Sequence, residues 1–218
     1  MNVTILGCSG GIGGARHTTS LLVDDDILVD AGSGVTQLSL AQLVLIDHVF
    51  ITHTHLDHIL ALPLMLDSVG AVRDHPVTVY AIDAVLEILR EHIFNWRVWP
   101  DFSEVPPERP YLRYAAIDVY QPVQLGDRAI TALPANHTVP AVGYKISSPT
   151  GSLVFSGDTA QNPALWDSIN HITDLRALIM ETAFPENEHG IAELSKHLSP
   201  QSLVDELQQL KLNVPVYI

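Results

Sequence analysis

The 218-residue chain has a single cysteine, Cys8, so no disulfide can form within it. It also has few cations, because 11 Lys and Arg stand against 25 Asp and Glu and give a formal net charge of −14. A field of that sign repels the phosphate backbone of long nucleic acids, and the cations are scattered rather than gathered in a patch. We therefore expect no long nucleic acid as a partner.

The sequence also lacks apolar segments of the kind that enter membranes. No apolar run reaches the roughly 18 residues that a spanning helix needs. The start, MNVTILGCSGG, has neither the basic segment nor the long apolar segment of a signal peptide. From these absences we expect a cytoplasmic protein with no membrane partner.

The composition is that of a folded chain, with 47% apolar and 17% charged residues, which excludes a disordered protein. At about 150 residues per domain, the length predicts a single domain over residues 1–218. A short apolar strand enters a Gly-rich loop at residues 7–14, where the G-x-G-x-x-G spacing of a dinucleotide site cannot be placed. We expect these glycines to serve tight backbone packing.

Apolar runs and turn signals alternate along both halves of the chain and predict an α/β sandwich, with sheets packed face to face and helices outside. Residues 20–30 predict a hairpin around three aspartates. The other predicted strands are 3–6, 48–52, 77–81, 117–119, 129–133, 142–146, 153–156, 177–180 and 214–218. The predicted helices are 35–45, 56–68, 84–94 and 201–210.

Metal-binding side chains are concentrated in the string THTHLDH at residues 52–58. His53 and His55 are two residues apart, so both imidazoles lie on the same side of an extended chain. Asp57 and His58 follow where the strand gives way to a helix. Burying four such side chains between apolar runs is costly unless they are paired or ligated. The string therefore predicts a metal site rather than a solvated turn.

The H-x-H-x-D-H string resembles the signature of the metallo-β-lactamase fold, and the resemblance extends over almost the whole chain. The segment PANHTVPAVGY resembles the stretch that carries the family's next ligand, and LVFSGDT resembles the one that carries its bridging carboxylate. The resemblance implies one metal ion on His53, His55 and His137, a second on Asp57 and His58, and Asp158 bridging them.

The implied ligands are nitrogen and oxygen with no thiolate, so we expect two divalent ions, zinc first and manganese or iron as alternatives. His55 favours hydrolysis, because the family's diiron redox branch usually has Glu there. The family also has a last histidine ligand after a late strand. Residues 215–218 resemble that strand, and the C-terminal end looks truncated at this point. Whether that histidine follows Ile218 stays open.

Two later segments resemble the phosphodiesterase branch of this family: METAF with Glu181, and SKHLSP with His197. The resemblance implies a carboxylate and a histidine beside the leaving group. Residues 53–68 and 92–102 resemble class II cyclic-nucleotide phosphodiesterases, and no Gly- and Lys-rich insertion of the transfer-RNA-binding kind is present.

The resemblance therefore implies hydrolysis of 3′,5′-cyclic nucleotides to 5′-monophosphates by a metal-bridging hydroxide, with Asp57, Glu181 and His197 as catalytic residues. Arg16 is a candidate phosphate contact. Aromatic rings stack on bases without sequence readout, so three rings in the 92–102 segment are candidates for holding a purine, with core or dimer packing as the alternative. They are Trp96, Trp99 and Phe102.

Three other hypotheses about the function stay open. One is a transfer-RNA 3′ processing endonuclease, whose binding would weaken strongly with salt. Another is a hydrolase of carboxylic esters, lactones or thioesters, and the last is a metal-binding scaffold without catalysis. The sequence also leaves open which cyclic nucleotide is preferred, which metal is bound and whether the chain forms a homodimer.

Overall fold

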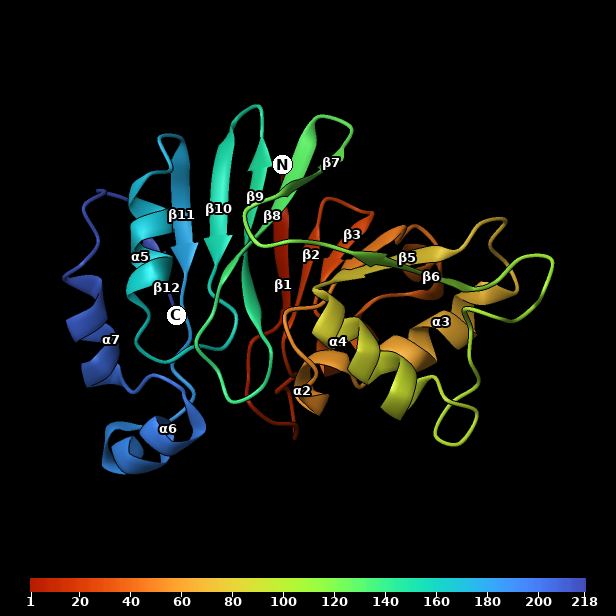
Figure 1. The fold of residues 1–218 in the computed structure, drawn as a ribbon, viewed down its shortest axis with the longest axis horizontal. Helices are drawn as coiled ribbons and strands as arrows, with labels where there is room; N and C mark the ends of the chain where they lie inside the picture. The colour runs from red at the N-terminus through yellow and green to blue at the C-terminus, as the bar shows by residue number, and fades with distance from the viewer. The chain divides into compact units, whose positions relative to one another are not determined.

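The computed structural model describes residues 1–218, which form two compact units, residues 1–116 and residues 117–218. Each unit contains one six-stranded sheet that is antiparallel over part of its width and parallel over the rest (Figure 1). The mixed sheets with helices are those of an α/β protein, as the alternating pattern predicts. No helix is long and apolar enough to cross a membrane.

The sheet of the first unit begins as an antiparallel meander and continues as parallel strands. The predicted hairpin is confirmed, with its turn at Asp24–Asp26, and parallel pairing starts at the third strand. In spatial order the strands are β1 (Val3–Gly7), β2 (Ser20–Val23), β3 (Ile27–Val29), β4 (His48–Phe50), β5 (Val77–Ala81) and β6 (Leu112–Ala116).

The helices of the first unit pack against alternate residues of the parallel strands. One face of the sheet carries Val49 and Ile51 from one segment and Val77 and Val79 from β5. On this face they join the buried side chains of α3 and α4 in one cluster. Figure 1 shows α2, α3 and α4 on the same side of this sheet. The helical segments are η1 (Ser33–Gln37), α1 (Leu40–Leu43), α2 (Leu56–Ile59), α3 (Leu62–Gly70), α4 (Asp83–Ile88) and the π-helical η2 (Leu89–Ile93).

Backbone pairing interrupts the helix that the sequence predicts over 56–68. Ala61 donates its N–H to the carbonyl of Ala31 (2.8 Å), and Ala31 donates to the carbonyl of His58 (2.7 Å). Pro63 then lies in the first turn of α3. The segment thus forms two short helices, α2 and α3, and α2 is attached by its backbone to the residues that follow β3.

Two other expectations need correction. The predicted helix 35–45 is two pieces, because Leu38 is extended and a capping box between Ser39 and Gln42 starts a separate helix. The predicted strand at 117–119 is wrong: β6 ends at Ala116, and Val119 makes only an isolated bridge. Strands β6 and β7 and helices α5 and α6 were not predicted from the sequence.

Glycine packing in the 7–14 loop is confirmed only in part. A side chain at Gly7 would collide with the carbonyl of Thr18, and one at Gly34 with the backbone of Leu6 and Gly7. Gly10 and Gly11, by contrast, face open space. Tight packing therefore explains the base of the loop and not its tip.

The second unit has the same division of its sheet, antiparallel from β7 to β10 and parallel from β10 to β12. In spatial order its strands are β12 (Val216–Tyr217), β11 (Leu175–Ile179), β10 (Gly151–Phe155), β9 (Val142–Ser148), β8 (Arg128–Pro134) and β7 (Pro122–Leu125). Its helical segments are α5 (Pro163–Asn170), η3 (Glu186–Glu188), α6 (His189–Ser195) and α7 (Pro200–Leu207). Figure 1 shows α5 and α7 together beside the parallel end of this sheet.

A buried carboxylate on α7 holds α5 and the loop before it. Glu206 is 5% exposed, and its Oε2 accepts the indole N–H of Trp166 (2.6 Å) and the backbone N–H of Asn162 (3.0 Å). The Asn162 amide in turn donates to the carbonyl of Pro134 at the end of β8 (2.8 Å). The interior of the second unit is thereby connected to the chain that leads towards His137.

Glu206→Ala is expected to lower the free energy of unfolding by roughly 2–6 kcal/mol. Two buried donors would lose their acceptor, and each such loss costs about 1–3 kcal/mol. Urea unfolding followed by Trp fluorescence measures the change. The neighbouring exposed Asp205→Ala is the control and is expected to stay within about 0.5 kcal/mol. Equal stability of both variants would show that Glu206 is not a structural centre.

Candidate metal centre

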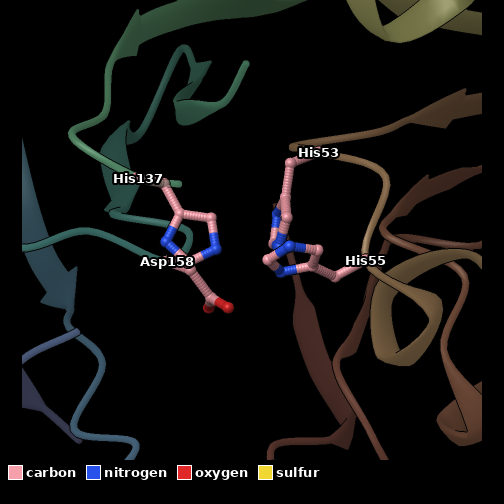
Figure 2. Close-up of side chains that lie close together, drawn as sticks. All are labelled: His53, His55, His137 and Asp158. Carbon is pink, nitrogen blue, oxygen red and sulfur yellow. The ribbon is translucent and has the colours of Figure 1, made fainter. Parts of the chain in front are cut away.

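The first unit presents four metal-capable side chains where β4 ends. His53 and His58 are almost fully buried, at 0% and 1% exposure, whereas His55 and Asp57 are half-buried. His55 is the N-cap residue of α2, so the chain turns from extended to helical within the motif. The ring of His53 lies 4.7 Å from that of His55 and 4.1 Å from that of His58, between centroids. Figure 2 shows His53 and His55 on the loop that follows β4.

Asp30 orients two of these histidines. Its side chain is fully buried, and Oδ2 lies 2.7 Å from Nδ1 of His58. The hydroxyl of Thr52 donates to the same oxygen (2.8 Å) and so can accept from Nδ1 of His53, 3.0 Å away. With Nδ1 engaged by the protein, each ring offers Nε2 as its ligand nitrogen, which is the usual arrangement of metal-bound histidine.

Burial is the main influence on Asp30 and raises the pKa of its carboxyl, while the neighbouring His58 opposes the rise. Asp30 adopts a left-handed backbone with φ of 58°, which is uncommon for a residue other than glycine. The next two residues pack closely against α2. Ala31 donates a backbone hydrogen bond to His58 of this helix, and a side chain at Gly32 would collide with the carbonyl of Asp57.

Sequence reasoning missed Asp30 as a functional residue and treated it as the last residue of a strand. The available signal was a carboxylate that directly follows the apolar strand β3. A charge at the end of a buried run needs a partner. No local pattern indicates, however, that its partner is a histidine 28 positions away.

The second unit presents His137 after β8 and Asp158 after β10, and Figure 2 shows the two side chains on separate loops. His137 is 7% exposed, and its Nδ1 lies 3.2 Å from the carbonyl oxygen of Lys196. A backbone carbonyl on Nδ1 again leaves Nε2 as the ligand nitrogen. Gly157, with φ of 60°, supplies the left-handed turn that precedes Asp158.

Glu181 and His197 form the pair that the sequence resemblance implies. Nδ1 of His197 donates to Oε1 of Glu181 (3.0 Å), and the same carboxylate accepts backbone N–H groups from Thr159 and Ala183. Burial raises the pKa of the Glu181 carboxyl, while the bond from His197 acts in the opposite direction.

The Glu181–His197 pair adjoins the ligand candidates of its own unit. The His197 ring packs edge-on against His137, with 4.8 Å between centroids, and Nδ1 lies 4.0 Å from Oδ2 of Asp158. Phe184 contacts the same ring, at 5.6 Å between centroids. The imidazole is thus held on several sides, and its Nδ1 is engaged by a carboxylate.

The donor set fits divalent metal ions, because it combines imidazole nitrogens oriented through Nδ1 with carboxylate oxygens. The residues that could hold metal ions are His53, His55, Asp57 and His58 in the first unit, and His137 and Asp158 in the second. These are the ligands that the sequence resemblance implies.

The aromatic segment does not lie beside the ligand motif of its own unit. The histidines follow the carboxyl end of β4, whereas Phe102 accepts the N–H of Leu112 and so lies where β6 begins. Helix α4 and η2 run from the edge where the parallel strands end to the edge where they begin. They lead to Trp96 and Trp99. Phe102 is only 4% exposed and Trp99 packs against the core. Phe102 and Trp99 are therefore packing residues of this unit, whereas Trp96 is 60% exposed and its contact with a substrate stays a prediction.

Arg16, by contrast, lies on a loop whose base adjoins the ligand motif in the fold. It is exposed and bridges to Gly13 in the loop between β1 and β2. The base of that loop is anchored by two hydrogen bonds between Thr18 and Ser33, of 2.7 and 2.8 Å. A side chain at Gly32 would meet both Thr18 and Asp57, so this base adjoins α2.

Comparison with known families gives a match over most of the chain. A model described as a beta-lactamase superfamily domain matches residues 25–218. A Yersinia pestis protein named "Probable 3',5'-cyclic-nucleotide phosphodiesterase" is 27% identical over 96% of this chain and 72% of its own length. A protein of Alkaliphilus oremlandii named "Ribonuclease Z" is 29% identical over 66% of this chain and 50% of its own. The chain thus spans half to about three quarters of these relatives.

Solved structures show the same fold. Unliganded yeast PDE1 superposes with a TM-score of 0.80 at 20% identity, covering 95% of this chain and 81% of that one. The short form of human tRNase Z gives 0.72 at 18% identity, covering 100% and 96%. These likenesses confirm the expected α/β fold of the metallo-β-lactamase type.

Asp30→Asn is expected to weaken zinc binding roughly 10–100-fold, the usual cost of losing a group that orients metal ligands. The amide keeps the shape of the carboxylate but loses the charge and one acceptor oxygen. Competition with a chromogenic chelator measures zinc affinity without any substrate. Asp25→Asn, on the exposed turn of the same hairpin, is the matched control and should bind zinc as the parent does. Unchanged affinity in Asp30→Asn would contradict the orienting role.

Proposed function

Since the chain belongs to the beta-lactamase superfamily, we propose that it is a metal-dependent phosphodiesterase that hydrolyses 3′,5′-cyclic nucleotides to nucleoside 5′-monophosphates. The observation that carries the proposal is the Glu181–His197 pair beside Asp158 and His137, a proton-transfer group next to ligand candidates. The relatives named cyclic-nucleotide phosphodiesterase support the choice of substrate. Two zinc ions and a cytoplasmic location are further parts of this proposal.

The ligand side chains of both units are proposed to bind the same two ions. His53, His55 and His137 would hold one ion, Asp57 and His58 the other, and Asp158 both. When bound, such ions acidify water and offset negative charge on phosphoryl oxygens. The protein's contribution is to hold each imidazole in one tautomer, through Asp30, Thr52 and the Lys196 carbonyl.

His197 is proposed to protonate the departing ribose 3′ oxygen. Its Nδ1 is engaged by Glu181, so Nε2 is the nitrogen that can deliver a proton. A ribose alkoxide is a poor leaving group, and a positioned acid therefore lowers the barrier to its departure. Glu181 would orient the ring, and backbone N–H groups of Thr159 and Ala183 hold Glu181 in place.

The alternative on this fold is a transfer-RNA 3′ processing endonuclease, which the relatives named ribonuclease Z favour. The net charge of −14 opposes it, because long RNA binds through its phosphates. Binding of transfer RNA would weaken steeply with salt, whereas turnover of a small cyclic substrate would respond little. Assays of cyclic AMP, cyclic GMP and precursor transfer RNA across a range of salt concentrations separate the two.

His197→Ala is expected to slow cyclic-nucleotide hydrolysis roughly 10²–10⁴-fold, the usual contribution of a general acid. Hydrolysis of a nitrophenyl phosphodiester should fall much less, because nitrophenolate leaves without a proton. Glu181→Gln should show the same selectivity more weakly. The measurement is kcat/KM on both substrates, together with metal content.

The possible outcomes have different meanings. Equal losses on the two substrates would mean that His197 acts through binding or folding. Loss of metal from His197→Ala would make it a ligand and overturn the arrangement. As a reference, His53→Ala and Asp158→Ala should lose metal and nearly all turnover on both substrates.

Arg16→Ala is expected to raise KM for cyclic nucleotides several-fold with little change in kcat. An exposed guanidinium that only helps to bind the phosphate contributes about 1 kcal/mol or less. Arg97→Ala, exposed in the aromatic segment, removes the same charge and is the matched control. A similar rise of KM in both variants would indicate a general charge effect and exclude a specific contact at Arg16.

A further inference from the structure

Helix α6 ends in a way that is unusual for a lysine. Lys196 has the left-handed backbone, with φ of 56° and ψ of 52°. Its N–H donates to the carbonyl of Glu193 (3.2 Å), and that of His197 donates to the carbonyl of Ala192 (2.8 Å). This pair of bonds is the Schellman motif, whose left-handed position is usually glycine because glycine has no Cβ to clash.

The same lysine contacts His137 twice, although 59 positions separate them. Its carbonyl oxygen lies 3.2 Å from Nδ1 of the imidazole, and its ammonium donates to the backbone carbonyl of His137 (3.1 Å). One contact sets the rotation of the ring and the other holds the backbone that carries the ring. Because the helix end determines where the Lys196 carbonyl points, both contacts depend on this turn.

Glycine in this position would satisfy the helix and could make only the first of the two contacts. The contact that requires lysine is therefore the one from its ammonium to His137. The next residue, His197, packs edge-on against the same imidazole and pairs with Glu181. Two consecutive residues thus contact His137, one on its backbone and Nδ1 and the other on its ring.

We propose that Lys196 is a positioning residue that holds His137 so that Nε2 is directed at a metal ion. The inference rests on the proposed role of His137 as a ligand and is independent of the substrate. In this role Lys196 touches neither the metal ion nor the substrate, and it contacts only the ligand residue His137. It acts by restricting the loop between β8 and His137, which is exposed to solvent in part.

The test uses variants that separate the helix end from the ammonium. Lys196→Gly keeps the left-handed turn and its carbonyl and removes the ammonium. Lys196→Met also removes the ammonium but keeps the backbone cost of a side chain at positive φ. Tyr120→Gly is the matched control, because Tyr120 is an exposed residue of the same unit with φ of 71° and no contact to His137 among those described.

Zinc affinity is measured by chelator competition, and stability by urea unfolding of the zinc-free protein. Both Lys196 variants should bind zinc about tenfold more weakly, at the lower end of the usual cost for an orienting group. Lys196→Gly should be as stable as the parent or more so. Lys196→Arg should recover part of the zinc affinity, and Tyr120→Gly should leave it unchanged.

A second measurement follows the imidazole of His137 itself. In ¹H–¹⁵N spectra of zinc-free protein, the Nδ1 proton of His137 should exchange with water faster in Lys196→Gly than in the parent. Parental zinc affinity in both Lys196→Gly and Lys196→Met would overturn the proposal, as would weakening that simply parallels lost stability. Absence of cyclic-nucleotide hydrolysis would instead contradict the proposed function and leave these binding results valid.

Discussion

The buried carboxylate of Asp30 is the interaction on which the first half of the candidate centre depends. It engages His58 directly and His53 through Thr52, so a single side chain selects the tautomer of two imidazoles. A carboxylate in such a place costs free energy unless its oxygens are bonded, and here both oxygens accept. The neighbouring residues Ala31 and Gly32 bring α2 close enough for this to happen.

In the second unit, different groups orient the histidines. Its ligand candidate His137 is oriented by a backbone carbonyl, and its acid candidate His197 by the carboxylate of Glu181. Glu206, far along the chain, fastens α5 and the end of β8 through Asn162. In both units, therefore, most ligand candidates follow the end of a strand, in a loop or in the short helix α2, and His197 follows the end of α6. Buried polar groups hold these segments in place.

The parts of the fold and of the candidate site that could be predicted are those whose sequence signal lies within a few residues. The motif at 52–58, the strand β5 and the helix predicted from residue 201, found as α7, could be predicted because spacing and periodicity act over a few residues. The break between α2 and α3 was not, because it is made by Ala31, a residue 30 positions earlier than its partner Ala61. Asp30, Lys196 and Glu206 escaped for the same reason: their partners are distant in sequence.

The left-handed lysine at the end of α6 has a consequence for how this chain can change over time. Selection for thermal stability alone would favour glycine at position 196, since that substitution removes a conformational cost and disturbs no buried packing. Selection for a well-ordered histidine would resist it. Position 196 is thus a place where a stability-directed library and an activity-directed library of this protein should diverge, and where a gain in one property is made at the expense of the other.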